Sequence, residues 1–253
     1  MKYRAEIDGL RALAVVPVIL FHAGFELFSG GFVGVDVFFV ISGYLITTIL
    51  IEDIENKSFS IVNFYERRAR RILPALTFMT IATIVLGWFV LTPYFYRDLF
   101  QTTFAISFFA SNILLYIKSG YFSAISELKP FLHTWSLGIE EQFYIFWPLI
   151  LWVAWKMRQN LLLICLFFML SSFLINIFWV SRFPTEIFFW PFGRFWELLV
   201  GSVLAWLMLY KANMFVSNGN KKIKSLIYIL SNFSRNGITT FIGIFVLLAS
   251  VFL

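Results

Sequence analysis

The sequence predicts an all-α protein, a polytopic bundle of membrane-spanning helices with about seven or eight candidate spans. Two observations lead to this fold class. Of the 253 residues, 60% are hydrophobic and only 13% are charged, whereas a soluble domain carries about 25% charged residues to cover its surface. The apolar residues also gather in long runs, many of them close to the 20 residues or so that a helix needs to cross a bilayer.

The candidate spans follow one another along the whole chain. The clear candidates are the segments 7–28, 31–51, 74–93, 143–155, 161–180, 187–210 and 227–253. The segment 99–117 is a weaker candidate because Gln, Thr, Ser and Asn side chains dilute its apolar residues. Polar segments separate these runs at 52–73 and 118–142.

Basic residues predict the orientation, because short cytoplasmic loops carry an excess of Lys and Arg. Lys2, Arg4 and a cluster within 67–71 place the N-terminus and the second loop in the cytoplasm. Lys156 and Arg158 favour the same side. Counting every candidate as a full span would place them outside. Either one element between residues 93 and 142 is re-entrant or interfacial, with 99–117 the least apolar candidate, or the rule for basic residues does not hold in this chain.

The remaining composition excludes other classes of protein. The net charge of +6 accompanies 33 Phe and 9 Trp in apolar runs, so we expect cytoplasmic loops and no nucleic-acid partner. A single cysteine, Cys165, excludes an internal disulfide, and no spacing favours a metal site. The last apolar run reaches residue 253 with no polar cap. We expect one transmembrane domain over 1–253, truncated at its C-terminus and without a soluble domain.

The first apolar run contains ionisable residues. Their insertion into a membrane costs free energy, so their presence there indicates a structural or functional role. Arg11 and His22 are eleven residues apart, which places them about 20° apart around a helix and roughly 16 Å apart along it. Asp8 lies one turn before Arg11, and Glu26 one turn beyond His22. The sequence thus predicts a polar stripe along one face of this helix.

His22 is the candidate general base of this stripe. Asp36 lies a turn and a half into the second span, so a hydrogen bond from His22 to Asp36 or to Glu26 is geometrically reasonable. A carboxylate there would fix the imidazole tautomer and raise its basicity. The alternative is a buried polar cluster that only fixes helix packing.

Four arginines precede Pro74, at positions 67, 68, 70 and 71. One interpretation is a topology signal in contact with anionic lipids. The other is a phosphate clamp, because guanidinium binds phosphate through two hydrogen bonds at once. Arg67 and Arg71 are one helical turn apart and are the candidate pair.

Two further polar groups interrupt the later spans. The segment that begins at His133 places Glu140 and Glu141 at the mouth of an apolar helix, where acids suit the helix dipole. Arg194 and Glu197 stand three residues apart inside a span. Arg194 and Glu197 either neutralise each other as an ion pair or have a functional role.

Five motifs in this order resemble the acyltransferase-3 family of bacterial integral-membrane O-acyltransferases. Each piece alone is weak, but together they cover about 200 residues. They are Glu-Ile-Asp-Gly-Leu-Arg-Ala at 6–12 with the Arg-x10-His pattern closed by His22, the segment 34–46, the arginines before Pro74, the segment 133–142, and Arg194-x-x-Glu197.

The resemblance implies a reaction and roles for residues. An acyl-CoA, most often acetyl-CoA, would bind from the cytoplasmic side of the bacterial inner membrane as a co-substrate. Its acyl group would pass to a hydroxyl of a cell-envelope polysaccharide, such as lipopolysaccharide, or of a glycolipid. His22 would be the base or a transient acyl carrier, while Arg11, Arg67 and Arg71 would hold the donor. The roughly 16 Å rise from Arg11 to His22 is comparable to a pantetheine arm.

Two other functions remain open from the residues alone. A secondary transporter or channel would use Arg11, His22, Asp36 and Glu197 as relay groups. Such a protein typically shows inverted repeats or broken helices at matching positions, and the sequence shows neither. The second alternative is that the chain is an inactive fragment of a longer acyltransferase.

Overall fold

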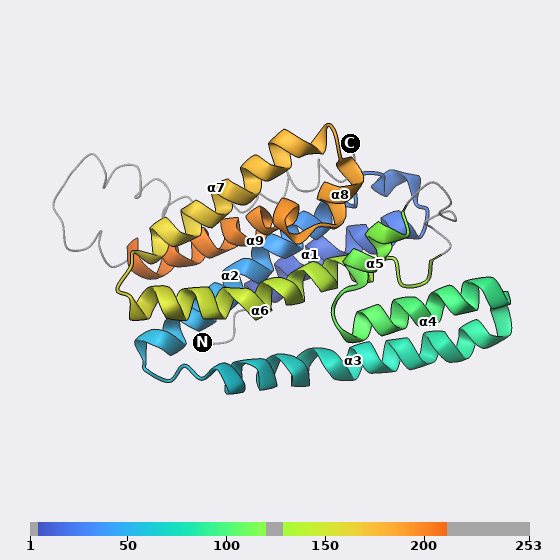
Figure 1. Cartoon of the computed structure of the whole chain (residues 1–253), viewed down its shortest axis with the longest axis horizontal. Coiled ribbons are helices and arrows are strands. Elements are labelled where there is room, and N and C mark those ends of the chain that lie inside the picture. The colour runs from blue at the N-terminus through green and yellow to red at the C-terminus, as the bar shows by residue number, and fades with distance from the viewer. Residues whose placement is uncertain (1–4, 120–128, 212–253) are drawn as a thin grey trace. The chain divides into compact units, whose positions relative to one another are not determined.

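The computed structural model describes residues 5–119 and 129–211, and every regular element in these two ranges is helical (Figure 1). The all-α prediction is confirmed. The α-helices are α1 (Ala5–His22), α2 (Val33–Glu55), α3 (Ile61–Val90), α4 (Pro93–Ser107), α5 (Ser111–Ile117), α6 (Thr134–Lys156), α7 (Leu161–Val180), α8 (Pro184–Phe189) and α9 (Pro191–Trp206). A 3₁₀ helix, η1 (Glu26–Phe28), and a π-helix, η3 (Leu207–Lys211), complete the described elements.

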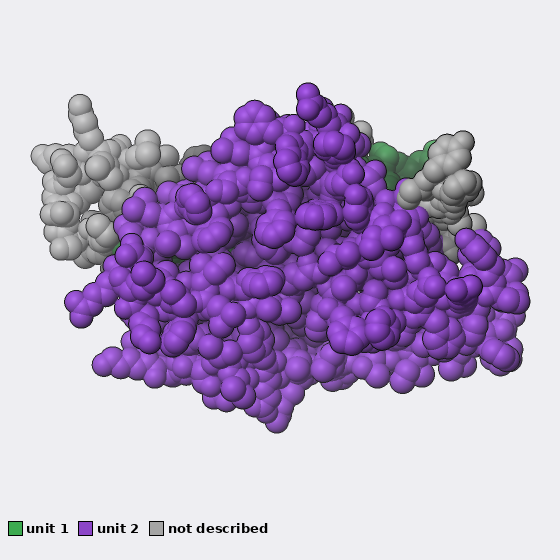
Figure 2. Space-filling model, viewed as in Figure 1, with its two compact units in different colours: residues 1–48, 200–253 green, residues 49–199 purple. Residues whose placement is uncertain are grey.

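The chain divides into two compact units, coloured separately in Figure 2. One unit comprises residues 1–48 and 200–253, and the other comprises residues 49–199. His22 and Arg11 belong to the first unit. The arginines of α3, the acids of α6 and the Arg194–Glu197 pair belong to the second.

Four helices within the described ranges are long and apolar enough to cross a membrane. They are Val33–Glu55, Ile61–Val90, Leu161–Trp179 and Pro191–Tyr210. Helices α1 and α6 also lie where spans were expected, but three charged residues in α1 and two buried acids in α6 dilute their apolar character. The expected span at 227–253 lies outside the described residues.

Glycines allow close helix packing in the first unit. A Cβ on Gly31 would lie 2.3 Å from the Pro17 carbonyl oxygen, and one on Gly34 would lie 2.0 Å from the Ala14 oxygen. The start of α2 is therefore pressed against the backbone of α1. Small residues are how membrane helices approach closely without a hydrophobic driving force. The same logic applies to Gly201 of α9, whose Cβ would meet the Val40 oxygen at 2.0 Å.

The expected weak span at 99–117 is two short helices separated by a break. Phe109 adopts a left-handed backbone conformation with φ 53°. Its N–H donates to the Ile106 carbonyl at 2.9 Å, and the N–H of Ala110 donates to the Ala105 carbonyl at 2.8 Å. This Schellman pattern ends a helix. Neither α4, with 15 residues, nor α5, with 7, is long enough to span a bilayer.

A polar network holds this break in place. The Gln142 amide donates to the Phe109 carbonyl at 2.8 Å and to the Asn112 Oδ1 at 2.9 Å. The Asn112 amide donates to the Phe189 carbonyl at 3.0 Å, and the Ser111 hydroxyl donates to the Thr134 carbonyl at 2.8 Å. The bond from Gln142 satisfies the Phe109 carbonyl at the break, and the other bonds tie α5 to α6 and α8.

Within the described residues, the helices after α3 reverse their direction twice. In Figure 1, α4 returns alongside α3, and α5 turns back from the end of α4. Helix α6 then runs opposite to α3, so that the first residue of α3 and the last residue of α6 lie at the same end (Figure 1). The expected re-entrant or interfacial element stays a prediction, and the short helices α4 and α5 are compatible with it.

Replacing Gln142 with Leu removes the hydrogen-bond donor to the Phe109 carbonyl oxygen and to the Asn112 Oδ1. We expect the free energy of unfolding in mixed detergent micelles to fall by about 1–3 kcal/mol. Gln159→Leu is the matched control, because the Gln159 amide makes only one exposed contact of 3.5 Å to a backbone oxygen. Equal stability of the two variants would contradict this role of the network.

Candidate functional site

His22 is the last residue of α1 and its imidazole is exposed. The Nδ1 atom lies 2.8 Å from the Val18 carbonyl oxygen. A carbonyl oxygen only accepts, so this hydrogen bond requires the proton on Nδ1. The neutral ring then carries its free lone pair on Nε2. The ring of Phe21 contacts the imidazole edge-on, with centroids 5.2 Å apart.

The described residues give His22 a backbone partner in place of the expected carboxylate. Within the described residues, the imidazole bonds to the Val18 carbonyl and to neither Asp36 nor Glu26. Asp36 lies in the first turn of α2 and is half-buried. The helix itself supplies the orienting acceptor that the sequence analysis assigned to an acid.

The polar stripe of α1 also ends earlier than predicted. Gly24 has φ 81°, its N–H donates to the Phe21 carbonyl at 3.0 Å, and the Phe25 N–H donates to the Leu20 carbonyl at 3.2 Å. This Schellman motif stops the helix directly after His22. Glu26 therefore lies in the separate η1 turn, and it does not continue the face that carries His22.

Arg11 is a half-buried cation of α1, as the predicted stripe requires. Its guanidinium lies over the Phe38 ring at 5.7 Å. The Nε atom is buried and has no hydrogen-bond partner among the described residues. An unpaired buried donor of this kind is costly, so a ligand that accepts a hydrogen bond would fit here.

The arginines of α3 have different surroundings. Arg67 is 58% exposed and pairs with Asp53 at 2.8 Å, and Arg70 is 79% exposed and pairs with Glu66 at 2.6 Å. Arg71 is exposed, and no described carboxylate pairs with it. Of the predicted Arg67–Arg71 pair, only Arg71 is free for a phosphate, and a ligand at Arg67 would compete with Asp53.

Arg68 is the inward-facing arginine, although the sequence pattern pointed to Arg67 and Arg71. Its guanidinium lies 5.0 Å from the Tyr144 ring centroid and 5.9 Å from that of Phe64. It also interacts electrostatically with Glu140 and Glu141. Phe64 and Leu76 are buried on the same helix, so the i, i+4 spacing from Phe64 was the signal that Arg68 points inward.

Glu140 and Glu141 are both buried in the second turn of α6. Glu140 accepts a short hydrogen bond from the Tyr144 hydroxyl. Glu141 Oε1 is buried with no partner among the described residues. These acids do more than cap a helix, because capping residues lie in the first turn and remain solvated. Together with Arg68 they form a buried charged cluster, defined here as the α3–α6 cluster.

Arg194 and Glu197 form the second buried charged pair of this unit. Arg194 Nη1 lies 2.9 Å from Glu197 Oε1, and the Glu197 side chain is 2% exposed. The Arg194 guanidinium also lies 5.5 Å from the Trp135 ring and 5.7 Å from the Phe188 ring. The i, i+3 ion pair is confirmed. His133, at the N-cap position of α6, is exposed, and its carbonyl accepts from the Ser136 hydroxyl at 3.2 Å.

Comparison with known proteins places the chain in a family. Residues 4–253 match the acyltransferase-3 family, described as an acyltransferase domain. The chain belongs to this family, as its five motifs predicted. No solved structure matches it.

The curated relatives have longer chains. Over 81% of this chain, it is 38% identical to peptidoglycan O-acetyltransferase OatA of Listeria monocytogenes and 40% identical to the putative peptidoglycan O-acetyltransferase YrhL of Bacillus subtilis. It is 34% identical to O-acetyltransferase OatA of Staphylococcus aureus, again over 81%. The match spans 34%, 33% and 35% of these relatives, respectively.

Arg68→Met tests the α3–α6 cluster, because it removes the cation and leaves two buried acids uncompensated. We expect the free energy of unfolding in detergent to fall by roughly 2 to 3 kcal/mol, somewhat less than for a fully buried pair. Arg70→Met on the exposed face should change it by less than about 0.5 kcal/mol. Losses of the same size for both variants would show that Arg68 is only a surface residue.

Proposed function

We propose that this chain is the membrane domain of a bacterial O-acetyltransferase. It would move an acetyl group from an acyl-CoA donor to a hydroxyl of a cell-wall glycan. The family assignment supports acyl transfer, and two relatives named as peptidoglycan O-acetyltransferases suggest peptidoglycan as the acceptor. The basic residues support a cytoplasmic N-terminus in the cell membrane.

The hydrogen bond from His22 Nδ1 to the Val18 carbonyl carries the proposal. It leaves Nε2 as an exposed base at the end of α1. In the proposed reaction, Nε2 takes the proton of the acceptor hydroxyl while the oxygen attacks the thioester carbonyl. The carbon–sulfur bond then breaks, and the CoA thiolate leaves with the proton from the imidazolium. The C-terminal end of the α1 dipole favours the imidazolium formed in between.

Arg11 and Arg71 support the donor half of the reaction. Both are arginines without a carboxylate partner among the described residues. The CoA moiety carries several phosphates, and guanidinium groups bind phosphate oxygens through charge-assisted hydrogen bonds. In this proposal Arg71 binds a phosphate directly, while Arg67 does so by exchanging its contact with Asp53.

The transporter alternative draws on the same charges. The described part of the chain pairs Arg194 with Glu197 and encloses the α3–α6 cluster within one unit. Internal compensation of this kind describes a fixed scaffold better than a chain of relay groups. Together with the family assignment, it favours acyl transfer.

The test uses the full chain in nanodiscs with radiolabelled acetyl-CoA and soluble peptidoglycan fragments. We expect His22→Gly to lower acetyl transfer by about 10²–10⁴-fold, the usual contribution of a general base. Added imidazole should restore part of the rate, because the site is exposed. Transfer at the normal rate by His22→Gly would overturn the mechanism. Label retained on wild-type His22 would instead identify it as an acyl carrier.

The donor arm of the same experiment measures acetyl-CoA binding. We expect Arg71→Gln to raise the Kd roughly tenfold or more, because a charge-assisted hydrogen bond contributes about 1.5–3 kcal/mol. Arg70→Gln on the same exposed helix face is the matched control and should bind normally. His22→Gly should also bind normally. Equal binding by both arginine variants would exclude Arg71 from the donor site.

A further inference from the structure

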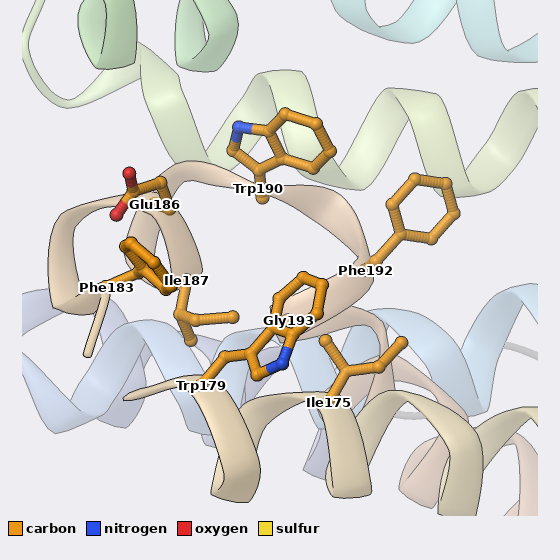
Figure 3. A pocket seen from close by; sticks show the side chains of 8 residues that line it. All are labelled: Ile175, Trp179, Phe183, Glu186, Ile187, Trp190, Phe192 and Gly193. Atoms are coloured by element: carbon orange, nitrogen blue, oxygen red, sulfur yellow. The ribbon is translucent and has the colours of Figure 1, made fainter. Parts of the chain in front are cut away.

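A pocket of about 420 Å³ lies where α7, α8 and α9 meet (Figure 3). All of its walls belong to the unit formed by residues 49–199. The lining residues are Ile175 and Trp179 of α7, Phe183, Glu186, Ile187, Trp190, and Phe192 and Gly193 at the start of α9. It holds none of the residues assigned to acetyl transfer.

The chemistry of the walls favours a hydrocarbon ligand. Glu186 is the one charged side chain among the lining residues, and it accepts a hydrogen bond from the Tyr116 hydroxyl at 3.2 Å. Figure 3 shows its carboxylate at the edge of the pocket, directed away from Ile175 and Trp179. The interior is therefore bounded by aliphatic and aromatic groups. Apolar cavities exclude water and bind apolar molecules.

The pocket is accessible from the surface that α7 presents. Trp179, Phe183, Trp190 and Phe192 are each about half exposed. Only 17% of the most apolar stretch of α7 is buried, and the mean hydropathy of this stretch is 2.6. A helix this apolar and this exposed faces lipid. The bilayer's own chains are thus the apolar molecules in immediate reach of the pocket.

A cation that directly precedes the lining residue Phe183 in the sequence indicates the rest of the ligand. Arg182 lies between Trp179 and Phe183 in the turn that follows α7, and it is exposed. No carboxylate of the described residues pairs with it. Trp residues and a basic side chain at a helix end are typical of the membrane–water interface. Lipid phosphates lie at that level, and guanidinium is their natural partner.

We infer that this pocket is a phospholipid-binding site. One acyl chain of a bilayer phospholipid fills the pocket, while its phosphate contacts Arg182. The bound chain braces α8 against the start of α9, directly before Arg194. Gly193 leaves no room for tighter packing there, because a Cβ would meet the Ile187 carbonyl oxygen at 2.8 Å. The inference does not depend on the proposed acetyl transfer.

Native mass spectrometry of the delipidated full chain tests the site by titration with a dioleoyl phosphatidylglycerol. Ile175→Trp fills the pocket from α7, and Ile177→Trp is the matched control because Ile177 is exposed on α7 and does not line the pocket. We expect one tightly retained lipid in wild type and in Ile177→Trp. In Ile175→Trp its apparent Kd should rise about tenfold or more.

Two further arms test the chemistry of the ligand. Dioleoylglycerol has the same chains without a phosphate, so we expect wild type to bind it more weakly than phosphatidylglycerol. The Arg182→Gln variant should bind the two lipids equally weakly. Equal lipid retention by the two Trp variants would overturn the site. Equal binding of both lipids to wild type would overturn the Arg182 contact. A polyprenyl phosphate that outcompetes phosphatidylglycerol by tenfold would overturn the assignment to a phospholipid.

Discussion

The constraint behind this structure is that polar groups within a bilayer must find their partners inside the protein. Most of the described polar groups obey it. Gln142 satisfies the carbonyl of the broken helix at Phe109, and the Tyr144 hydroxyl satisfies Glu140. Arg194 and Glu197 compensate each other. These pairs allow helices with charged residues to pack into a membrane bundle.

Several buried polar atoms in the described ranges depart from this pattern, among them Ser42 Oγ, Trp196 Nε1 and two atoms of the charged groups described above. The Arg11 Nε and the Glu141 Oε1 are buried without a hydrogen-bond partner, and the His22 Nε2 is left unprotonated by the bond to Val18. Unsatisfied buried polar groups cost free energy, and proteins retain them mainly at functional sites. The α1 groups carry the proposed acyl transfer, while Glu141 adds a hydrogen-bond acceptor beside Arg68.

The sequence predicted the regular parts of the fold well because apolar runs and helix bounds follow the same physics. The expected span at 161–180 coincides with α7, and residues 31–51 lie largely within α2. The break at Phe109 was not predictable from local residues, since Gly would be the usual residue at φ 53°. Gln142, more than 30 positions later, holds that break through a contact that only the folded chain shows.

The sequence identified several residues of the candidate site but not how these residues are arranged. Hydropathy identified His22 and Arg11 as costly residues, but the helix stop at Gly24 removed Glu26 from their face. Among the arginines, charge density drew attention to the exposed positions, whereas the inward position belongs to Arg68. A spacing rule applied from Phe64 would have found it.

The tautomer of His22 tests the central claim most directly, because the proposed base exists only if Nε2 is unprotonated in the neutral ring. The chain contains two histidines, so ¹⁵N-histidine labelling of the full chain in nanodiscs gives two imidazole patterns. A His133→Gln sample assigns them. The account predicts that neutral His22 carries its proton on Nδ1, and a proton on Nε2 would contradict it.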